Sequence, residues 1–205
     1  MDVQRTRRRV LTDLGLGGLA SFAGPSLLRG AGLRRKKLPV AAVITQYFKY
    51  SHADVLVGKI LNGWRQAGGP GPDLELVSMY VDQFSEKDLS RDLAKKHGFR
   101  IARTIDEAVT LGTNRVSVAG VLSVGEHGDY PWNAQEQHMY PRRHFYEQIC
   151  GVLSKSPLRH EVPIFTDKFL ANTWDDALWI YETGKELGLV HMAGSSVPNC
   201  FHRDP

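Results

Sequence analysis

One segment of this 205-residue chain, from Glu126 to His144, is unusually rich in side chains suited to chemistry. Within it, His127, Asp129 and His138 could ligate a metal, but their spacing fits no standard metal motif, so we predict no metal site. A polar pocket for a sugar or another small ligand is one interpretation of the segment. A structural loop whose polar groups bond to one another is the alternative.

Two further residues stand where predicted strands end. Lys168 follows the predicted strand Val162–Thr166, and Asp82 follows the predicted strand Leu74–Val81. Ligands of open parallel sheets bind at the carboxyl ends of the strands, so both residues are candidates for a binding site. The alternatives are a surface lysine at a strand end and a loop or helix-capping aspartate.

The elements that would position these residues alternate regularly from Leu38 onward. Strands are predicted at Pro39–Thr45, Leu74–Val81, Arg100–Ala102, Arg115–Val124, Val162–Thr166 and Val190–Ala193. Helices are predicted at His52–Ala67, Ser85–His97, Thr104–Leu111, Arg142–Leu153 and from Asn172 or Thr173 to Leu187. Such alternation predicts an α/β fold with an open, doubly wound parallel sheet, Rossmann-like, of about six strands in the order 3-2-1-4-5-6.

The charge of the chain is divided unevenly. Residues 1–37 hold nine Arg or Lys against two Asp, whereas the remainder holds 17 basic and 20 acidic side chains. The body therefore gives no electrostatic reason to expect a nucleic acid partner. No run reaches the 18 or so uninterrupted apolar residues of a transmembrane helix, so no stable membrane span is expected once a signal is removed.

Residues 1–37 have the layout of an export signal followed by a basic linker, with a positive start, a weakly apolar middle and a basic end. The run Thr6-Arg7-Arg8-Arg9-Val10-Leu11 resembles a twin-arginine signal. This resemblance implies a periplasmic or extracytoplasmic protein, and the alternative is a disordered basic arm. We expect residues 38–198 to form one Rossmann-like domain and residues 199–205 an unstructured tail.

Several segments of the body resemble the N-terminal domain of the glucose-fructose oxidoreductase and inositol dehydrogenase family (Gfo/Idh/MocA). The likeness is distributed over four segments. The first is a strand that ends in an acidic residue, together with the helix after it, and the second is a short helix after the third strand. The third is a strand followed by a lysine, and the fourth is a last strand that ends near a glycine. These segments are Leu76–Gly98, Thr104–Ala108, Val162–Ala171 with the tripeptide Asp167-Lys168-Phe169, and His191–Ser195.

The resemblance implies a role for each matched position. The cofactor would be NAD or NADP and the ligand a sugar or polyol, with Lys168 as a catalytic residue beside the nicotinamide and Asp82 on the ribose. Other cofactor contacts would come from the ends of the first and fourth strands, at Thr45, Gln46, Gly125, Glu126 and His127.

The sequence departs from the family at the first strand–helix turn, where Thr45–Ser51 has no glycine. Glycines there allow the pyrophosphate to approach the backbone, so we predict weak NAD(P) binding or none. The chain also stops where the family's second domain would begin, so we expect that domain to be absent. Two hypotheses follow: a truncated or divergent oxidoreductase relative, and a non-catalytic module for a sugar or phosphate that has lost the dinucleotide. Exposed apolar surface beside the last strand, with homo-oligomerisation, is expected in either case.

Overall fold

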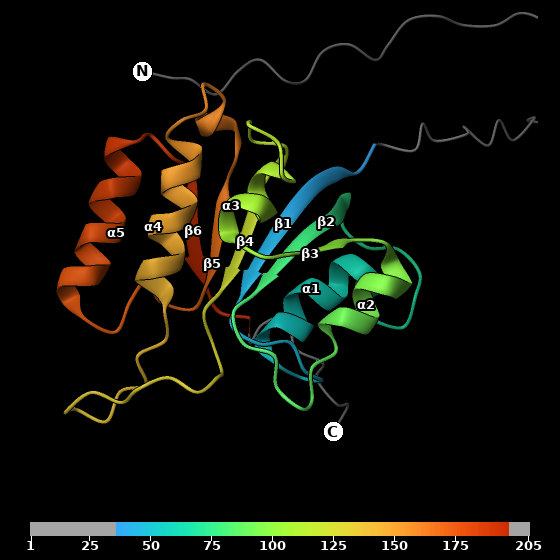
Figure 1. The fold of residues 1–205 in the computed structure, drawn as a ribbon, viewed down its shortest axis with the longest axis horizontal. Coiled ribbons are helices and arrows are strands. Elements are labelled where there is room, and N and C mark those ends of the chain that lie inside the picture. The colour runs from blue at the N-terminus through green and yellow to red at the C-terminus, as the bar shows by residue number, and fades with distance from the viewer. Residues whose placement is uncertain (1–35, 197–205) are drawn as a thin grey trace, which may run out of the picture. The chain divides into compact units, whose positions relative to one another are not determined.

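The computed structural model describes residues 36–196, in which six parallel strands form one sheet in the order β3-β2-β1-β4-β5-β6 (Figure 1). The strands are β1 Leu38–Ile44, β2 Leu74–Val81, β3 Arg100–Ala102, β4 Val121–Val124, β5 Ile164–Asp167 and β6 His191–Gly194. The predicted fold class and strand order are confirmed. The predicted export signal and linker lie outside the described residues except for the last two positions, 36 and 37, and the predicted tail lies outside them too.

Five α-helices cover the two faces of the sheet (Figure 1). One face carries α1 His52–Asn62 and α2 Ser90–His97, and the other carries α3 Ile105–Thr110, α4 Arg142–Leu153 and α5 Trp174–Glu186. The central strand β1 serves both layers. Ala41 and Val43 lie in the core under α3 and α4, whereas Ala42 and Ile44 lie in the core under α1, as expected for a strand buried on both faces.

Three predicted boundaries were wrong. The first helix ends at Asn62 because Gly63 takes φ 81, and a Cβ there would lie 2.8 Å from the carbonyl oxygen of Gly69. The second helix begins at Ser90, five residues late. The fourth strand begins only at Val121; before it, the N–H of Ser117 donates to the carbonyl oxygen of Val109 in α3 and not to a strand.

Capping chemistry fixes one end each of two helices, α3 and α2. The Thr104 hydroxyl accepts a 3.0 Å bond from the N–H of Glu107, and Gly98 ends α2 with φ 80. The Glu107 carboxylate accepts in return from the N–H of Arg103, one residue before the N-cap.

The large aromatic side chains on and beside the helices differ in burial. Trp64, Trp174 and Tyr181 are 54%, 76% and 59% exposed. Trp64 lies beyond the end of α1, and the other two lie on the outer face of α5. Trp179 does pack against the core.

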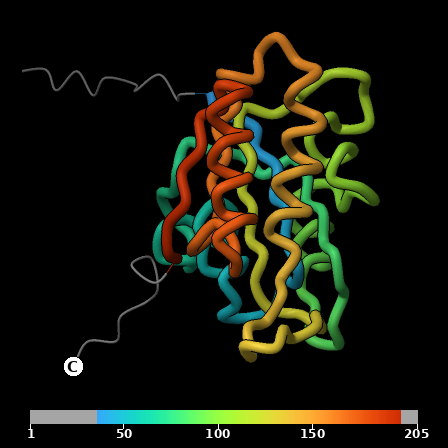
Figure 2. The backbone as a smooth tube through the Cα atoms, turned by 90° about the vertical axis from the view of Figure 1, so that its left-hand side faces the viewer, coloured from blue at the N-terminus to red at the C-terminus, as the bar shows by residue number. Residues whose placement is uncertain are grey.

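The last strand, β6, forms one edge of the sheet beside α5 (Figure 2). Val190 and Met192 are 55% and 62% exposed, and Met192 continues a row across the sheet with Phe165 and Leu122. The expectation of exposed apolar surface beside this strand is confirmed. Homo-oligomerisation stays a prediction. Among residues 36–196, no helix combines the length and the apolar character needed to cross a bilayer.

Candidate functional site

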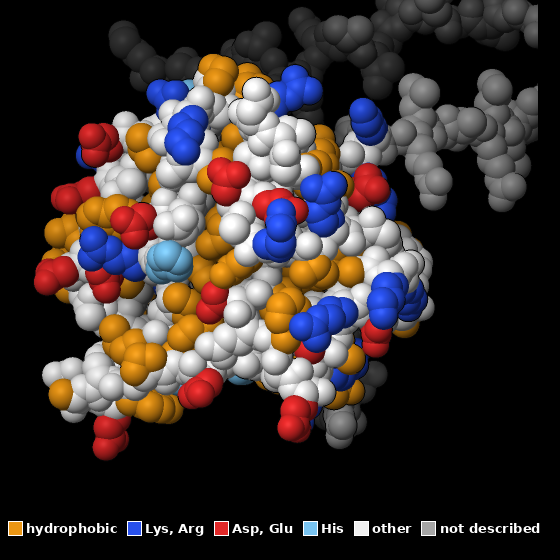
Figure 3. Space-filling model, viewed as in Figure 1, with side chains coloured by type: hydrophobic (Ala, Val, Ile, Leu, Met, Phe, Trp, Pro, Cys, Tyr) orange, Lys and Arg blue, Asp and Glu red, His pale blue; other side chains and the backbone are white. Residues whose placement is uncertain are grey.

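The ends of β1, β4 and β5 lie side by side at one edge of the sheet, because these strands are parallel neighbours. The long connection between β4 and α4, residues 125–141, folds beside this edge, at the lower left of Figure 1. Figure 3 shows hydrophobic side chains gathered over this connection, whereas acidic and basic side chains are interspersed over the rest of the visible face.

At this edge one carboxylate lies between two cations. Lys168 Nζ is 2.6 Å from Oε1 of Glu126, and Oε2 of Glu126 accepts from Arg142, which also donates a 2.9 Å bond to Asn172. The Arg142 side chain is only 3% exposed, and burial lowers its pKa. A Cβ on Gly125 would lie 2.9 Å from Cγ of Arg142, so this glycine permits the approach of the arginine.

The predicted proximity of Lys168 to the segment after the fourth strand is therefore correct. The catalytic role of Lys168 and the cofactor roles of the other residues stay predictions.

A cavity of about 430 Å³ opens beside this charged cluster. Its wall offers a carboxylate, two amides, an imidazole, a phenol and a guanidinium, supplied by Glu126, Gln137, Asn172, His138, Tyr140 and Arg142. The half-exposed ring of Phe169 completes it, 4.3 Å from the Arg142 guanidinium. The Nε of Arg142 is buried and has no hydrogen-bond partner among the described residues.

The carboxylate expected to bind ribose is already engaged. Oδ1 of Asp82 accepts a 2.6 Å bond from the hydroxyl of Tyr80, and Oδ2 accepts a 2.6 Å bond from the hydroxyl of Tyr130. Burial, helped by the bond to Asp82, raises the pKa of Tyr80 to about 12, and the same causes raise the pKa of Tyr130. Both phenols therefore remain protonated donors at neutral pH.

The segment that carries Tyr130 is fastened to the end of β2 by a second set of bonds. The Gln83 amide donates to the carbonyl oxygen of Asp129 at 2.9 Å and accepts from its N–H at 2.8 Å, while Gln46 donates to Gln83 at 3.3 Å. Gly128, with φ 118, has no room for a Cβ, which would lie 2.5 Å from the Tyr130 ring. The loop thus takes up the region where a dinucleotide's ribose would lie.

The first strand–helix turn is filled by side chains. Tyr47 is 1% exposed, and its hydroxyl donates to Asp54 at 3.3 Å. Thr45 is fully buried, donates to the carbonyl oxygen of Glu126 and accepts from its N–H at 3.1 Å. The residues present therefore do not fit a pyrophosphate at this turn, which agrees with the missing glycines.

An aspartate–histidine pair at the same edge was missed by sequence reasoning. Oδ2 of Asp167, at the end of β5, lies 2.8 Å from Nδ1 of His52, the first residue of α1. Ser196 adds two contacts: its N–H donates to Oδ1 of Asp167 at 3.0 Å, and its Oγ lies 2.6 Å from Nδ1 of His52. One signal was available in the sequence: an acidic residue, Asp167, directly follows a strand predicted to be buried.

His127 lies against this pair. Its ring centroid is 5.4 Å from that of His52 and 4.9 Å from that of Phe48. Its Nε2 is buried without a hydrogen-bond partner among residues 36–196, and burial, with smaller contributions from His52 and Lys168, lowers its pKa.

Three residues at this edge have left-handed backbone conformations. Tyr50, His127 and Lys168 take φ 66, 69 and 67. Each such conformation costs a non-glycine residue about 1–2 kcal/mol, and strained residues of this kind cluster at ligand and catalytic sites.

The three residues considered for a metal do not come together as a ligand set. His138 stacks on Trp132 with ring centroids 4.2 Å apart and bonds to the carbonyl oxygen of Tyr130, whereas His127 lies against His52. Within the described part of the chain, no group of three His, Cys, Asp or Glu side chains could hold a metal ion.

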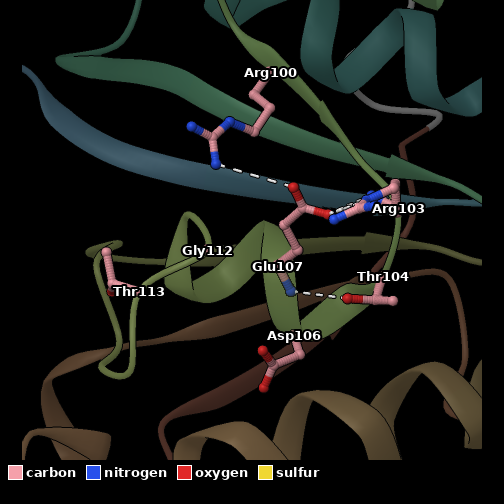
Figure 4. Close-up of a pocket in the computed structure, with 7 residues that line it drawn as sticks. All are labelled: Arg100, Arg103, Thr104, Asp106, Glu107, Gly112 and Thr113. Carbon is pink, nitrogen blue, oxygen red and sulfur yellow. Dashed lines mark hydrogen bonds and ion pairs between the residues drawn. The ribbon is translucent and has the colours of Figure 1, made fainter.

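A larger hollow, of about 580 Å³, lies between β3 and α3 (Figure 4). Three of its four charged side chains are already paired, because Glu107 meets Arg103 at 3.4 Å and Arg100 at 4.0 Å, and Arg100 also donates to the carbonyl oxygen of Leu111. Its polar atoms are not among those that are buried and unpartnered. The smaller cavity at the carboxyl edge is therefore the stronger candidate.

Several solved structures are similar to this chain. A biliverdin reductase from Synechocystis sp. PCC 6803, in complex with biliverdin and NADP+, matches with a TM-score of 0.45 and 16% identity over 76% of this chain and 37% of its own. An NAD binding oxidoreductase from Klebsiella pneumoniae matches with a TM-score of 0.45 and 12% identity over 77% and 34%. An apo scyllo-inositol dehydrogenase from Lactobacillus casei gives 0.48 and 12% over 77% and 36%.

The chain thus spans little more than a third of these proteins. No protein-family model matches the sequence, and neither does any curated protein.

Proposed function

We propose that this protein binds a small polyhydroxylated ligand, a sugar or a polyol, at the carboxyl edge of a Rossmann-like domain that does not hold a dinucleotide. The observation that carries the proposal is the engagement of Asp82 by Tyr80 and Tyr130. A dinucleotide's ribose would have to compete with these two hydroxyls for the carboxylate. Hydrogen bonds to charged groups contribute about 1.5–3 kcal/mol each, so this competition opposes binding.

The chemistry of the 430 Å³ cavity supports a polyhydroxylated ligand. Hydroxyl groups both donate and accept, and the cavity offers acceptors on Glu126, donors on Arg142 and groups of both kinds on Asn172. The unpartnered Nε of buried Arg142 is a donor for a ligand oxygen. Phe169 offers an apolar ring face of the kind on which the C–H groups of a sugar pack.

The proposal extends to where the protein acts. Residues 1–37, with their arginine pair, would direct it out of the cytoplasm through the twin-arginine pathway. The protein would then be an exported, divergent relative of nucleotide-dependent sugar and polyol oxidoreductases that has kept the binding edge.

Calorimetry on the full chain tests the proposal, with NAD, NADP, D-glucose, D-fructose and myo-inositol as probes. We expect no heat from either dinucleotide at millimolar concentration and a dissociation constant below 1 mM, about −4 kcal/mol, for at least one sugar or polyol. A dinucleotide dissociation constant at or below about 10 μM, near −7 kcal/mol, would overturn the proposal.

A matched pair of variants locates the ligand. Phe169→Ala removes a ring stacked on Arg142 inside the cavity, whereas Phe84→Ala removes a ring stacked on Arg91 away from it. Both rings are exposed, 52% and 41%, so neither change should unfold the protein. We expect about tenfold weaker binding for Phe169→Ala and none of this loss for Phe84→Ala. Equal affinities for the two variants would exclude the cavity as the site.

A further inference from the structure

His52 and Asp167 have the geometry of an acid–base pair, although nothing in the fold requires a histidine at the start of α1. The Asp167 side chain is 1% exposed, and Oδ2 meets Nδ1 of His52 at 2.8 Å. The N–H of Ser196 holds the other carboxylate oxygen at 3.0 Å. The carboxylate is therefore fixed from two sides and buried, whereas the His52 side chain retains 20% of its exposure.

The hydrogen bond assigns the tautomer of His52. An ionised carboxylate can only accept, so Nδ1 carries the hydrogen and Nε2 of the neutral ring carries the lone pair. No hydrogen bond to Nε2 of His52 is found among residues 36–196, which leaves this basic nitrogen for a ligand. A carboxylate behind an imidazole also stabilises the imidazolium that forms when Nε2 takes a proton.

Groups that can stabilise a developing negative charge lie beside the pair. The ammonium of Lys168 is 27% exposed and paired with Glu126, and Lys168 directly follows Asp167 in the chain. His127, whose ring lies 5.4 Å from that of His52, has the buried and unpartnered Nε2 described above. His127 is in turn close enough to Glu126, Lys168 and Asp167 for their charges to act on it, and His127 and Lys168 can each supply a hydrogen-bond donor.

We propose that His52 is the general base of a proton transfer on an α-hydroxy carbonyl compound, the open-chain form of a sugar, with Asp167 as its positioning residue. The proposal rests on the proposed function for the class of ligand. It assigns this edge a reaction that needs no dinucleotide, because no electrons leave or enter the ligand.

The step is balanced within the ligand and His52. The bond between the hydrogen and the carbon next to the carbonyl breaks, and the proton goes to Nε2 of His52. The electron pair forms a carbon–carbon double bond, and the carbonyl electrons move onto the oxygen, whose charge faces the Lys168 ammonium. Return of the proton to the same carbon regenerates the ligand. In D2O the imidazolium exchanges its proton with solvent first, so deuterium is returned.

The test is the loss of carbon-bound proton signals from dihydroxyacetone and D-fructose by NMR, with the full chain in D2O. We expect the unaltered protein to exchange these protons faster than buffer alone does. In His52→Gln the exchange rate should fall by about 100-fold or more, since a positioned general base contributes about 10²–10⁴-fold. His144→Gln, which changes an exposed imidazole on α4, should exchange like the unaltered protein.

Asp167→Asn separates a positioning role from a structural one. A variant that folds, by circular dichroism, and exchanges with a displaced pH profile supports the assignment; an unchanged profile overturns it. Unaltered exchange in His52→Gln overturns it as well.

Different results would reject the acid–base role of His52 and the proposed binding function. Binding of D-fructose by calorimetry without any exchange rejects the acid–base role and leaves the binding function standing. Absence of binding for every sugar and polyol rejects the binding function itself.

Discussion

The hydroxyl of Tyr130 donates a 2.6 Å hydrogen bond to Oδ2 of Asp82, a residue 48 positions earlier in the chain. This bond joins the connection after β4 to the end of β2. The resemblance of the sequence to a dinucleotide-binding family assigned Asp82 to a ribose, whereas in the folded chain its carboxylate orders a loop. The same loop carries Glu126 and His127 to the carboxyl edge of the sheet, so its attachment bears on every residue of the candidate site.

Tyr130→Phe tests that attachment. Loss of the hydroxyl leaves Oδ2 of Asp82 without this donor, and we expect the free energy of unfolding to fall by about 1 kcal/mol. Amide hydrogen exchange should quicken across residues 125–131, because local opening no longer breaks the bond. Tyr181→Phe, on the exposed face of α5, is the control. Identical exchange in the two variants would show that Tyr130 does not hold the loop.

Two glycine substitutions should have opposite effects on stability. Gly128→Ala places a Cβ at φ 118 and 2.5 Å from the Tyr130 ring, so we expect a loss of about 1–3 kcal/mol in urea unfolding. Gly151→Ala lies on an exposed turn of α4 with nothing within 4 Å of the new Cβ. There we expect a gain of about 0.5–1 kcal/mol from helix propensity. A loss at both positions would contradict this account.

Stability should fall in mild acid. Burial lowers the pKa of His127 and of His191, so both imidazoles bind protons less readily in the folded protein than in the unfolded chain. Below pH about 6.5 the unfolded chain takes up these protons, which favours unfolding. The stability that depends on the two neutral imidazoles is fully present above that pH and is lost as the pH falls. We expect the free energy of unfolding to rise between pH 5 and 7, and to rise less steeply in the double variant His127→Gln, His191→Gln. A flat profile in the unaltered protein would refute this.

Export can be measured without the folded domain. A reporter fused to residues 1–37 should leave the cytoplasm in cells with a working twin-arginine system and remain inside in cells that lack it. Replacing Arg7 and Arg8 by Lys should strongly reduce the exported fraction, while replacing Arg34 and Arg35 provides a control with the same change of residue type. Equal export from both kinds of cell would dismiss the assignment.

The sequence predicted the sheet well because buried parallel strands leave a plain apolar signal. Leu74–Val81 was right at both ends, and the alternation of strands with helices was sufficient for the strand order. Boundaries failed where a backbone detail decides them. Gly63 ends a helix whose apolar pattern continues, and Ser117, within the predicted fourth strand, bonds to Val109 of α3 and not to the sheet.

The candidate site was partly predictable for a related reason. Lys168 and Glu126 follow neighbouring parallel strands, so their proximity follows from topology alone. The pairing of His52 with Asp167 spans 115 positions and depends on where the first turn of α1 meets the end of β5. No local sequence pattern predicts that His52 and Asp167 lie close together. Likewise, nothing in the sequence near Asp82 predicts that two tyrosine hydroxyls bond to its oxygens.

The left-handed backbone conformations of Tyr50, His127 and Lys168 imply a trade-off between thermal stability and the proposed ligand binding. Glycine or asparagine at these positions would relieve strain of about 1–2 kcal/mol each, while removing groups that face the ligand edge. A library selected for survival at high temperature alone should therefore accumulate such replacements at these positions. A library selected for sugar binding should reject these replacements. Variants selected for thermostability alone would therefore keep the sheet and lose these side chains at its carboxyl edge.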